Sequence, residues 1–349
     1  MDEYRISSKM KTIIDLSDEF WQRSDLNQSA ETIDMINNQE VSKKMRKILL
    51  DTPKEIVDAS FIIPVQDGAI TAYLFSEPEK TMRGLSPLII FFHGGGWMYG
   101  NMEFYSYFLS HLASVTGASI LSIDYRLSPR YKFPTAIEDC YDALLWAAEG
   151  VKYWRIDPDR IFVAGDSAGG TLAAAIALLA RDRKGPQLAG QILLYPITDG
   201  RLRTLSIEEH ANSPMLSKKI LQNYIDSYQR EPKDILSPLF SPLLAQDKSR
   251  LAPALIIAAE NDPLKDDAIL YAEELEKAGT ETKVFMAPNA FHGFMFYKHA
   301  DGREQTECAI RQFISGRPIK NIQYLCEKML KKDNRIRAHE VAVSGGPGK

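Results

Sequence analysis

The chain carries short, unbroken apolar runs, separated by longer segments in which apolar residues recur every three or four positions. Short unbroken runs of this kind are typical of strands that are buried on both faces of a sheet. The strand-like segments occupy residues 87–92, 119–123, 160–164, 191–194, 253–258 and 281–287. They predict the central strands of one buried sheet.

Helical spacing fills the intervals between these strands, at residues 104–116, 135–149, 168–182 and 265–278, and it returns at 303–315. Strands that alternate with helices form a mainly parallel sheet with helices on both faces. Residues 60–65 and 69–75 flank the turn Gln66-Asp67-Gly68, which is a β-hairpin signal. We therefore expect an α/β protein whose sheet begins with a hairpin.

Two regions break this alternation, and we expect them to form a helical cap. Residues 1–55 are polar, with helical apolar spacing near Ile13 and again near Ile48, which predicts two short amphipathic helices. Residues 199–244 contain four prolines and one helix-like segment, and an interval of this size is expected to be an insertion over the sheet. The main domain is then expected to span residues 56–318.

The C-terminal part of the chain departs from the pattern again. Residues 319–332 have one apolar side and predict an extra helix, which must be buried on the domain or in a subunit interface. The composition of residues 333–349 is typical of a disordered tail. Both a monomer and a homodimer fit this pattern.

Composition narrows the class of protein. The chain is 45% hydrophobic and 25% charged with a net charge of −4, which is ordinary for a soluble globular protein and unlike a nucleic-acid binder. No apolar run is long enough for a membrane span, and the first residues do not resemble a signal peptide, so we expect a cytoplasmic protein. Its three cysteines, Cys140, Cys308 and Cys326, are scattered and form no CxxC pair, and no histidines cluster, so neither a disulfide framework nor a zinc site is expected. No cofactor and no other metal is expected either.

The first chemical motif is Gly165-Asp166-Ser167-Ala168-Gly169, which lies between a predicted strand and an alanine-rich predicted helix. A sharp strand-to-helix turn with small residues on either side of the serine lifts the hydroxyl above the sheet. Gly-x-Ser-x-Gly alone is weakly specific, but its strand–turn–helix context favours a nucleophile over a structural serine. Ser167 is therefore the candidate nucleophile.

The second motif is His93-Gly94-Gly95-Gly96-Trp97, which directly follows a predicted buried strand. Consecutive glycines allow backbone N–H groups to approach a carbonyl oxygen on which negative charge develops, and one such donor typically contributes 10²–10³ in rate. Together with the Ser167 turn, this pattern favours an oxyanion hole over a flexible glycine turn.

These two motifs, together with the stretch from Asp124 to Pro129, resemble the hormone-sensitive-lipase-like family of α/β-hydrolase esterases, over about residues 58–315. The resemblance implies the α/β-hydrolase fold, with an eight-stranded, mainly parallel sheet and a helical cap. The sequence departs from the family pattern at Arg130, where an acidic residue is common, and at Asp267, where glutamate is usual.

The resemblance also implies the remaining site residues. The triad acid is expected at Asp262 in Asp262-Pro-Leu, and the base at His292, which follows the last strand in Phe291-His292-Gly293. The oxyanion donors are expected among Gly94, Gly95, Gly96 and Ala168, supported by His93 and Asp166. The nearby acids Asp266 and Asp267 are expected only to begin the next helix, as charges that complement its dipole.

The function that follows is that of a serine carboxylesterase acting on small-molecule esters with short-to-medium acyl chains. A deacetylase or amidase acting on N- or O-acetyl small molecules is the main alternative, because the same triad cleaves both bonds. A non-catalytic small-ligand receptor is a third reading, which the intact triad positions disfavour. Pocket-lining candidates are Phe20, Trp21, Trp97 and Met215, and each of them would serve equally well in ordinary packing.

Overall fold

The structure is a computed structural model, and it describes residues 7–21, 29–37, 43–52, 56–77 and 84–317. The extra helix expected at 319–332 and the tail expected at 333–349 lie outside the described residues. Within the described part of the chain, no helix combines the length and the apolar character that crossing a membrane requires.

One eight-stranded sheet runs through the molecule, in the order β1-β2-β4-β3-β5-β6-β7-β8. Its strands are β1 (Val57–Val65), β2 (Gly68–Ser76), β3 (Ser86–Phe92), β4 (Ser119–Asp124), β5 (Ile156–Asp166), β6 (Gly190–Leu194), β7 (Ala254–Asn261) and β8 (Thr282–Phe291). β1 and β2 form the expected hairpin, and β2 pairs antiparallel with β4. All other neighbouring strands are parallel, so the expected α/β fold class is confirmed.

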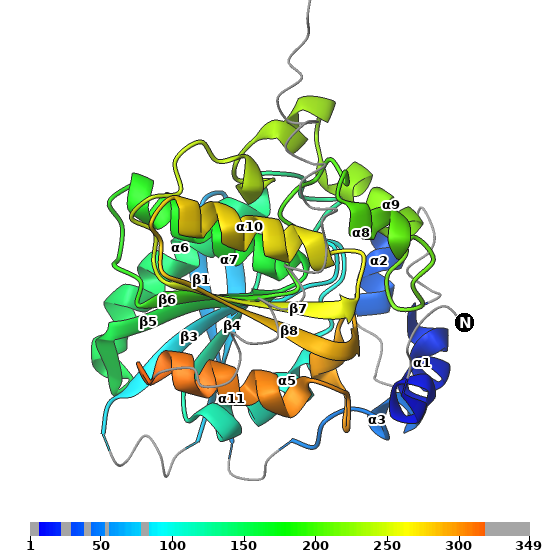
Figure 1. Cartoon of the computed structure of the whole chain (residues 1–349). Helices are drawn as coiled ribbons and strands as arrows, with labels where there is room; N and C mark the ends of the chain where they lie inside the picture. The colour runs from blue at the N-terminus through cyan, green and yellow to red at the C-terminus, as the bar shows by residue number, and fades with distance from the viewer. Residues whose placement is uncertain (1–6, 22–28, 38–42, 53–55, 78–83, 318–349) are drawn as a thin grey trace, which may run out of the picture.

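Helices cover both faces of this sheet (Figure 1). On one face lie α6 (Thr135–Gly150), α7 (Ala168–Asp182) and α10 (Lys265–Lys277), and on the other lie α5 (Met102–Thr116) and α11 (Arg303–Ile314). Side chains alternate between the two faces along a strand. In β3, Ile90 joins the apolar cluster beneath α6 and α7, whereas Phe91 joins the cluster beneath α5 and α11. The unbroken apolar pattern of the strand therefore reflects two cores.

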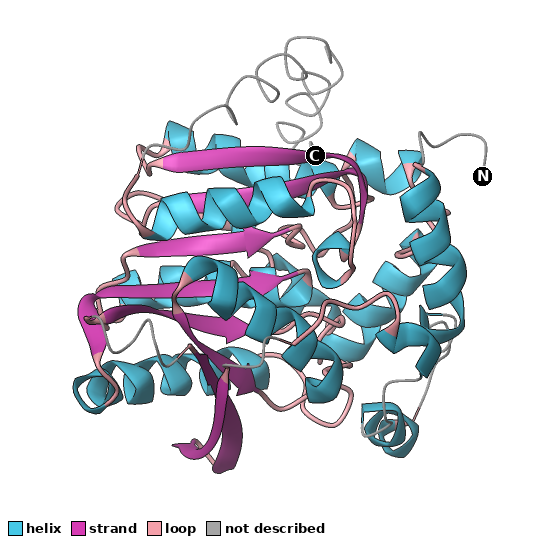
Figure 2. Cartoon of the chain, turned by 90° about the horizontal axis from the view of Figure 1, so that it is seen from below, coloured by secondary structure: helices cyan, strands magenta, loops and turns pink. Residues whose placement is uncertain are grey.

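The 3₁₀ turns η2 (Val151–Tyr153) and η5 (Phe294–Phe296) follow α6 and β8, and the remaining helices come from the two segments that break the alternation. They are α1 (Ser8–Trp21), α2 (Ala30–Asn37), α3 (Lys43–Arg46), α8 (Leu205–Glu209), α9 (Lys218–Tyr228), and the 3₁₀ turns η3 (Pro232–Leu236) and η4 (Pro242–Leu244). In Figure 1, α1, α2, α8 and α9 lie together on the right, beyond the carboxyl ends of the parallel strands, and Figure 2 shows the same side from below.

The expectation of two helices in residues 1–55 was wrong, because the described residues of this segment form three. The polar stretch between the expected pair contains α2. The expected second helix is reduced to the four residues of α3, since the chain beyond it straightens and Leu49 forms a β-bridge with Tyr297.

The sheet topology brings distant parts of the sequence to one edge. β5 ends immediately before Ser167, β7 immediately before Asp262, and β8 immediately before His292. These strands are parallel and are separated only by β6. Their carboxyl ends therefore meet at the same edge of the sheet, where ligands bind in open α/β folds.

Candidate active site

Ser167 occupies the sharp turn between β5 and α7, with φ 54° and ψ −122°. Its N–H donates to the carbonyl of Leu194 at 2.8 Å, which fixes the turn to β6. A Cβ at Gly169 would lie 1.9 Å from the carbonyl oxygen of Phe92, and one at Gly165 would lie 2.2 Å from the oxygen of Gly169. Only glycine fits at these two positions, which explains the motif in physical terms.

His292 connects Ser167 to Asp262. Its Nε2 lies 2.9 Å from the Ser167 hydroxyl oxygen, and its Nδ1 lies 2.8 Å from Oδ2 of Asp262. All three side chains are buried, and Asp262 is completely inaccessible to solvent. The geometry suits an imidazole that donates its Nδ1 proton to the carboxylate and keeps Nε2 as an acceptor for the hydroxyl proton. The structure therefore brings together the three residues expected to form the triad.

The Gly94 N–H is already used within the protein. It donates to Oδ1 of Asp166 at 2.9 Å and to the hydroxyl oxygen of Tyr105 at 2.8 Å. The Tyr105 hydroxyl in turn donates to the Asp166 carboxylate, at 3.1 Å from Oδ2. Of the expected oxyanion donors, Gly94 is thus committed to holding the glycine loop against the serine turn.

The N–H groups of the other three expected donors are not engaged in this way. No acceptor among the described residues takes the N–H of Gly95, Gly96 or Ala168. Gly95 and Gly96 have positive φ values of 101° and 63°, so the loop turns its backbone in a way that L-residues rarely adopt. Ala168 begins α7, where the first N–H groups have no partner within the helix.

His93 and Asp166 are both buried, and burial shifts the pKa of each. Burial lowers the pKa of His93 to about 4, so its ring is neutral at physiological pH. The ring stacks on Tyr125 with 4.3 Å between centroids, and the Tyr125 hydroxyl donates to the His93 carbonyl. Burial raises the pKa of Asp166 to about 6, against the opposing effect of the Gly94 N–H. These residues hold the glycine loop without facing the solvent.

A pocket opens above Ser167 and His292, with a volume of about 810 Å³ that includes the solvent at its mouth. Residues from the glycine loop, α2, α5, α9 and the segment after β8 line it: Asn37, Gly95, Gly96, Tyr99, Gly100, Asn101, Phe104, Tyr105, Asp166, Ser167, Met215, Leu216, Tyr224, His292, Gly293 and Phe296.

Of the pocket candidates from sequence, Met215 lines the cavity. Trp97 does not; it is fully buried and stacks on Tyr228 with 4.5 Å between ring centroids. The side chains of Phe20 and Trp21 lie outside the described part of the structure. Sequence reasoning missed Asn37 and Tyr105, because neither an amide in a polar stretch nor an aromatic residue in an amphipathic helix carries a signal of its own.

In the described part of the chain, no group of three or more His, Cys, Asp or Glu side chains is placed to hold a metal ion. Cys140 and Cys308 are free thiols, and Cys140 is buried in α6. Cys326 lies outside the described residues. Beside the phenols and amides of its lining, the pocket presents the Ser167 hydroxyl and the His292 imidazole, and the Asp262 carboxylate is bonded to that imidazole.

Comparison with known proteins agrees with this geometry. Residues 89–296 match the family described as having the alpha/beta hydrolase fold, and this match spans the glycine loop, the serine turn and the histidine. The chain belongs to the hormone-sensitive-lipase-like family of α/β hydrolases. The family resemblance inferred from the motifs is thereby confirmed.

Individual relatives of this α/β hydrolase cover most of its length. It is 35% identical to an arylesterase of Saccharolobus solfataricus over 74% of this chain and 84% of the relative. It is 34% identical to an ethyl acetate hydrolase of Pseudomonas putida over 70% of this chain and 77% of the relative. A solved hyperthermophilic esterase from Pyrobaculum calidifontis superposes with a TM-score of 0.74 at 30% identity, covering 89% of this chain and 98% of the other.

Proposed function

We propose that this α/β hydrolase is a serine carboxylesterase that cleaves esters with short-to-medium acyl chains through an acyl-enzyme intermediate on Ser167. The observation that carries the proposal is the pair of contacts made by His292, at 2.9 Å to Ser167 and 2.8 Å to Asp262, at the floor of the pocket. A base that is hydrogen-bonded to a hydroxyl and oriented by a buried carboxylate is the arrangement that activates serine.

In the proposed reaction, His292 Nε2 takes the proton of the Ser167 hydroxyl while the oxygen attacks the ester carbonyl carbon. Asp262 holds the imidazole in the required tautomer and stabilises its charged form. His292 then gives that proton to the departing alkoxide, which leaves as the alcohol. Water repeats the two steps on the acyl-enzyme, so the acid is released and Ser167 is restored.

We assign the stabilisation of the negative charge on the tetrahedral oxygen to the N–H groups of Gly95, Gly96 and Ala168. Gly94 is left out because its N–H already has two acceptors, Asp166 and Tyr105. N–H donors that are fixed before the reaction stabilise an oxyanion without reorganising during the step. Asp166 and His93 are assigned supporting roles, because they hold the loop that carries these donors.

The substrate class is supported by the relatives and by the pocket. One relative is named as an arylesterase and another as an ethyl acetate hydrolase. The helices of residues 1–55 and 199–244 are assigned to a cap that limits the pocket, since Asn37 from α2 and Tyr224 from α9 line it. A pocket bounded in this way accommodates a short acyl chain more readily than a long one.

The substrate class is tested with purified protein and a p-nitrophenyl series from acetate through butyrate and octanoate to palmitate, with p-nitroacetanilide as the matched amide. We expect kcat/KM to be highest between acetate and octanoate and at least about tenfold lower for palmitate, since each factor of ten costs only about 1.4 kcal/mol of transition-state binding.

Three outcomes would contradict the proposal. A maximum at palmitate would place the protein among long-chain lipases. A higher kcat/KM for the anilide than for the acetate ester would favour the deacetylase or amidase reading. Binding of esters without turnover would favour a ligand receptor.

A further inference from the structure

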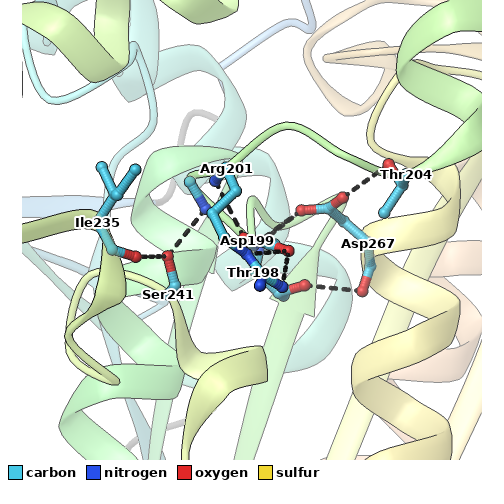
Figure 3. A network of polar contacts seen from close by, with 8 residues as sticks. Thr198, Asp199, Arg201, Thr204, Ile235, Ser241 and Asp267 are labelled. Carbon is cyan, nitrogen blue, oxygen red and sulfur yellow. Dashed lines mark hydrogen bonds and ion pairs between the residues drawn. The ribbon is translucent and has the colours of Figure 1, made fainter. Parts of the chain in front are cut away.

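A second polar cluster lies between the loop that follows β6 and the start of α10 (Figure 3). The Asp267 carboxylate accepts hydrogen bonds through Oδ2 from the backbone N–H groups of Thr198 at 2.8 Å and Asp199 at 3.0 Å. Its Oδ1 accepts from the Thr204 hydroxyl at 3.1 Å. All three donors belong to one segment, residues 198–206, which runs into the first turn of α8 and is called loop 198–206 below.

These groups are sealed from solvent. Asp267, Thr198 and Asp199 have no accessible surface, and Thr204 is 1% exposed. The Thr198 hydroxyl donates to the backbone carbonyl of Asp267 at 2.9 Å, so the loop binds both the side chain and the main chain of this residue. Breaking such a buried contact leaves donors unpaired, which is costly, so the cluster is stiff.

The same loop reaches the neighbours of Asp262 directly. The Ser206 hydroxyl donates to the carbonyl of Pro263 at 2.6 Å and accepts the N–H of Asp266 at 3.1 Å. The Ser206 N–H donates to Oδ2 of Asp266 at 2.8 Å. The turn that follows Asp262 is therefore tied to the loop at both of its ends.

Within the turn, Asp262 is held by local contacts. Its Oδ1 accepts the N–H of Leu264 at 2.9 Å, and its backbone carbonyl accepts the N–H of Lys265 at 3.0 Å. The direction of the Asp262 carboxylate thus depends on where residues 262–267 lie. Hydrogen bonds from loop 198–206 hold Pro263, Asp266 and Asp267 of this turn.

Loop 198–206 also forms the start of residues 199–244, the segment assigned to the cap. The Gly200 N–H donates to the Ser241 hydroxyl at 2.9 Å, and that hydroxyl donates to the carbonyl of Ile235 at 2.7 Å. Arg201 pairs with Asp199 at 2.7 Å (Figure 3). Both ends of residues 199–244 are therefore joined to the loop that holds the turn after Asp262.

We propose that Asp267 is a positioning residue for Asp262: by fixing the turn 262–267 against loop 198–206, it keeps the Asp262 carboxylate directed at Nδ1 of His292. The proposal rests on the triad assigned above. It gives Asp267 a role beyond the helix-dipole charge that its place at the start of α10 suggests, since the hydrogen bonds that its carboxylate accepts come from Thr198, Asp199 and Thr204 of the loop.

Asparagine is a conservative replacement for Asp267. Burial, with a further effect from the charge of Asp199, raises the pKa of Asp267 to about 7. An asparagine has the same shape and no charge. Its amide oxygen can accept the N–H groups of Thr198 and Asp199, and its NH₂ can donate to the Thr204 hydroxyl. Asp267→Asn therefore keeps the side-chain contacts, whereas Asp267→Ala removes all of them and leaves only the bond from the Thr198 hydroxyl to the backbone carbonyl.

The experiment measures kcat and KM for p-nitrophenyl butyrate, well below the melting temperature of each variant. We expect Asp267→Ala to lower kcat by about a hundredfold, since a misplacement near 1 Å has that effect, with KM changed by less than about threefold. Asp267→Asn is expected to recover most of kcat. Ser206→Ala, which removes one hydroxyl beside Pro263, is expected to lower kcat by about tenfold.

The matched control is Asp234→Ala. Asp234 is also buried and also accepts two backbone N–H groups, those of Arg230 and Glu231, but its carboxylate bonds within residues 230–234 rather than to the turn after Asp262. We expect this variant to lose stability while kcat stays within about twofold of the wild-type value. In proton NMR, the downfield signal of the His292 Nδ1 proton is expected to shift or broaden in Asp267→Ala and to stay in place in Asp234→Ala.

Equal kcat in Asp267→Ala and Asp234→Ala would overturn the proposal, as would an Asp267→Asn variant as slow as Asp267→Ala. If Asp267→Ala does not fold, Ser206→Ala decides, and a wild-type kcat in that variant contradicts the proposal. Ser167→Ala is measured alongside. Activity retained in Ser167→Ala would remove the assigned triad itself, whereas an inactive Ser167→Ala with a fully active Asp267→Ala would remove only the positioning role.

Discussion

Ser167 is held in a backbone conformation that an L-residue rarely adopts, with φ 54°. A residue in such a region typically costs about 1–3 kcal/mol, so the surrounding structure must stabilise it. Here the N–H of Ser167 bonds to Leu194, and glycines at 165 and 169 let the turn approach β3 closely. The stabilisation thus comes from the two neighbouring strands, β6 and β3, rather than from the turn itself.

Tyr105 connects the glycine loop to Asp166 through its hydroxyl, which a single substitution can remove. Its hydroxyl accepts the Gly94 N–H and donates to Asp166, and both bonds are buried. Tyr105→Phe keeps the ring and removes the bonds, so the glycine loop should hold its donors less firmly. We expect kcat/KM to fall by about tenfold, because a buried hydrogen bond contributes about 1–1.5 kcal/mol.

The control for this variant is Tyr107→Phe on the same helix, which removes a hydroxyl outside the pocket and should leave kcat/KM nearly unchanged. Steady-state kinetics on p-nitrophenyl acetate make the comparison. Equal losses in the two variants would show that Tyr105 acts only through the stability of α5.

At the residue scale, the motifs predicted Ser167, Asp262 and His292, because each lies in a local pattern that is visible in the sequence. Tyr105 and Asp267 were not predicted in their present roles. The phenol of Tyr105 reaches Asp166 across 61 positions, and the carboxylate of Asp267 reaches Thr198 across 69. No local pattern encodes contacts of that range.

At the scale of elements, the buried strands were predicted well and their polar ends were not. β5 begins at Ile156, ahead of the expected start at 160. The prediction was too late because Asp157, Pro158 and Asp159 interrupt the apolar pattern of the strand. β8 continues to Phe291 rather than 287, through Pro288 and Asn289. The helix α2 was missed altogether, since its exposed residues Glu31 and Asp34 are polar and its last residue, Asn37, bonds to residues that follow the glycine loop.

The helix α2 is fastened to that loop by its last residue. Asn37 accepts the Gly100 N–H at 3.0 Å and donates to the Met98 carbonyl at 3.2 Å, while Asn101 donates to the Asn37 carbonyl. Because Asn37 also lines the pocket, Asn37→Ala should loosen one wall without touching the triad. We expect KM to rise by about three- to tenfold with kcat changed by less than about twofold, as removal of one or two hydrogen bonds implies.

Thr32→Ala is the matched control for Asn37→Ala. Thr32 lies on α2, and its side chain contacts Ser29 rather than the glycine loop. We expect its KM to match the wild-type value. A fall in kcat with unchanged KM for Asn37→Ala would contradict the assignment of Asn37 to substrate binding.

At the scale of the whole molecule, the sheet brings the residues of the site together. Two apolar clusters hold the helices on its faces, and the parallel order of β5, β6, β7 and β8 brings three distant loops to one edge. The α/β alternation in the sequence predicted this arrangement, since parallel strands place their carboxyl ends together. The position of the segments assigned to the cap was beyond such reasoning, because it depends on contacts between loops rather than on periodicity.

The central claim is that His292 and Asp262 activate one serine, Ser167. The most direct measurement is the rate and position of covalent labelling by a fluorophosphonate, followed by mass spectrometry of the intact and digested protein. The probe reacts with an activated serine hydroxyl and loses fluoride, so labelling reports the nucleophile itself. The account predicts a single adduct on Ser167, no adduct in Ser167→Ala, and labelling slowed by at least about a thousandfold in His292→Ala. An adduct on another residue, or equal labelling rates with and without His292, would contradict it.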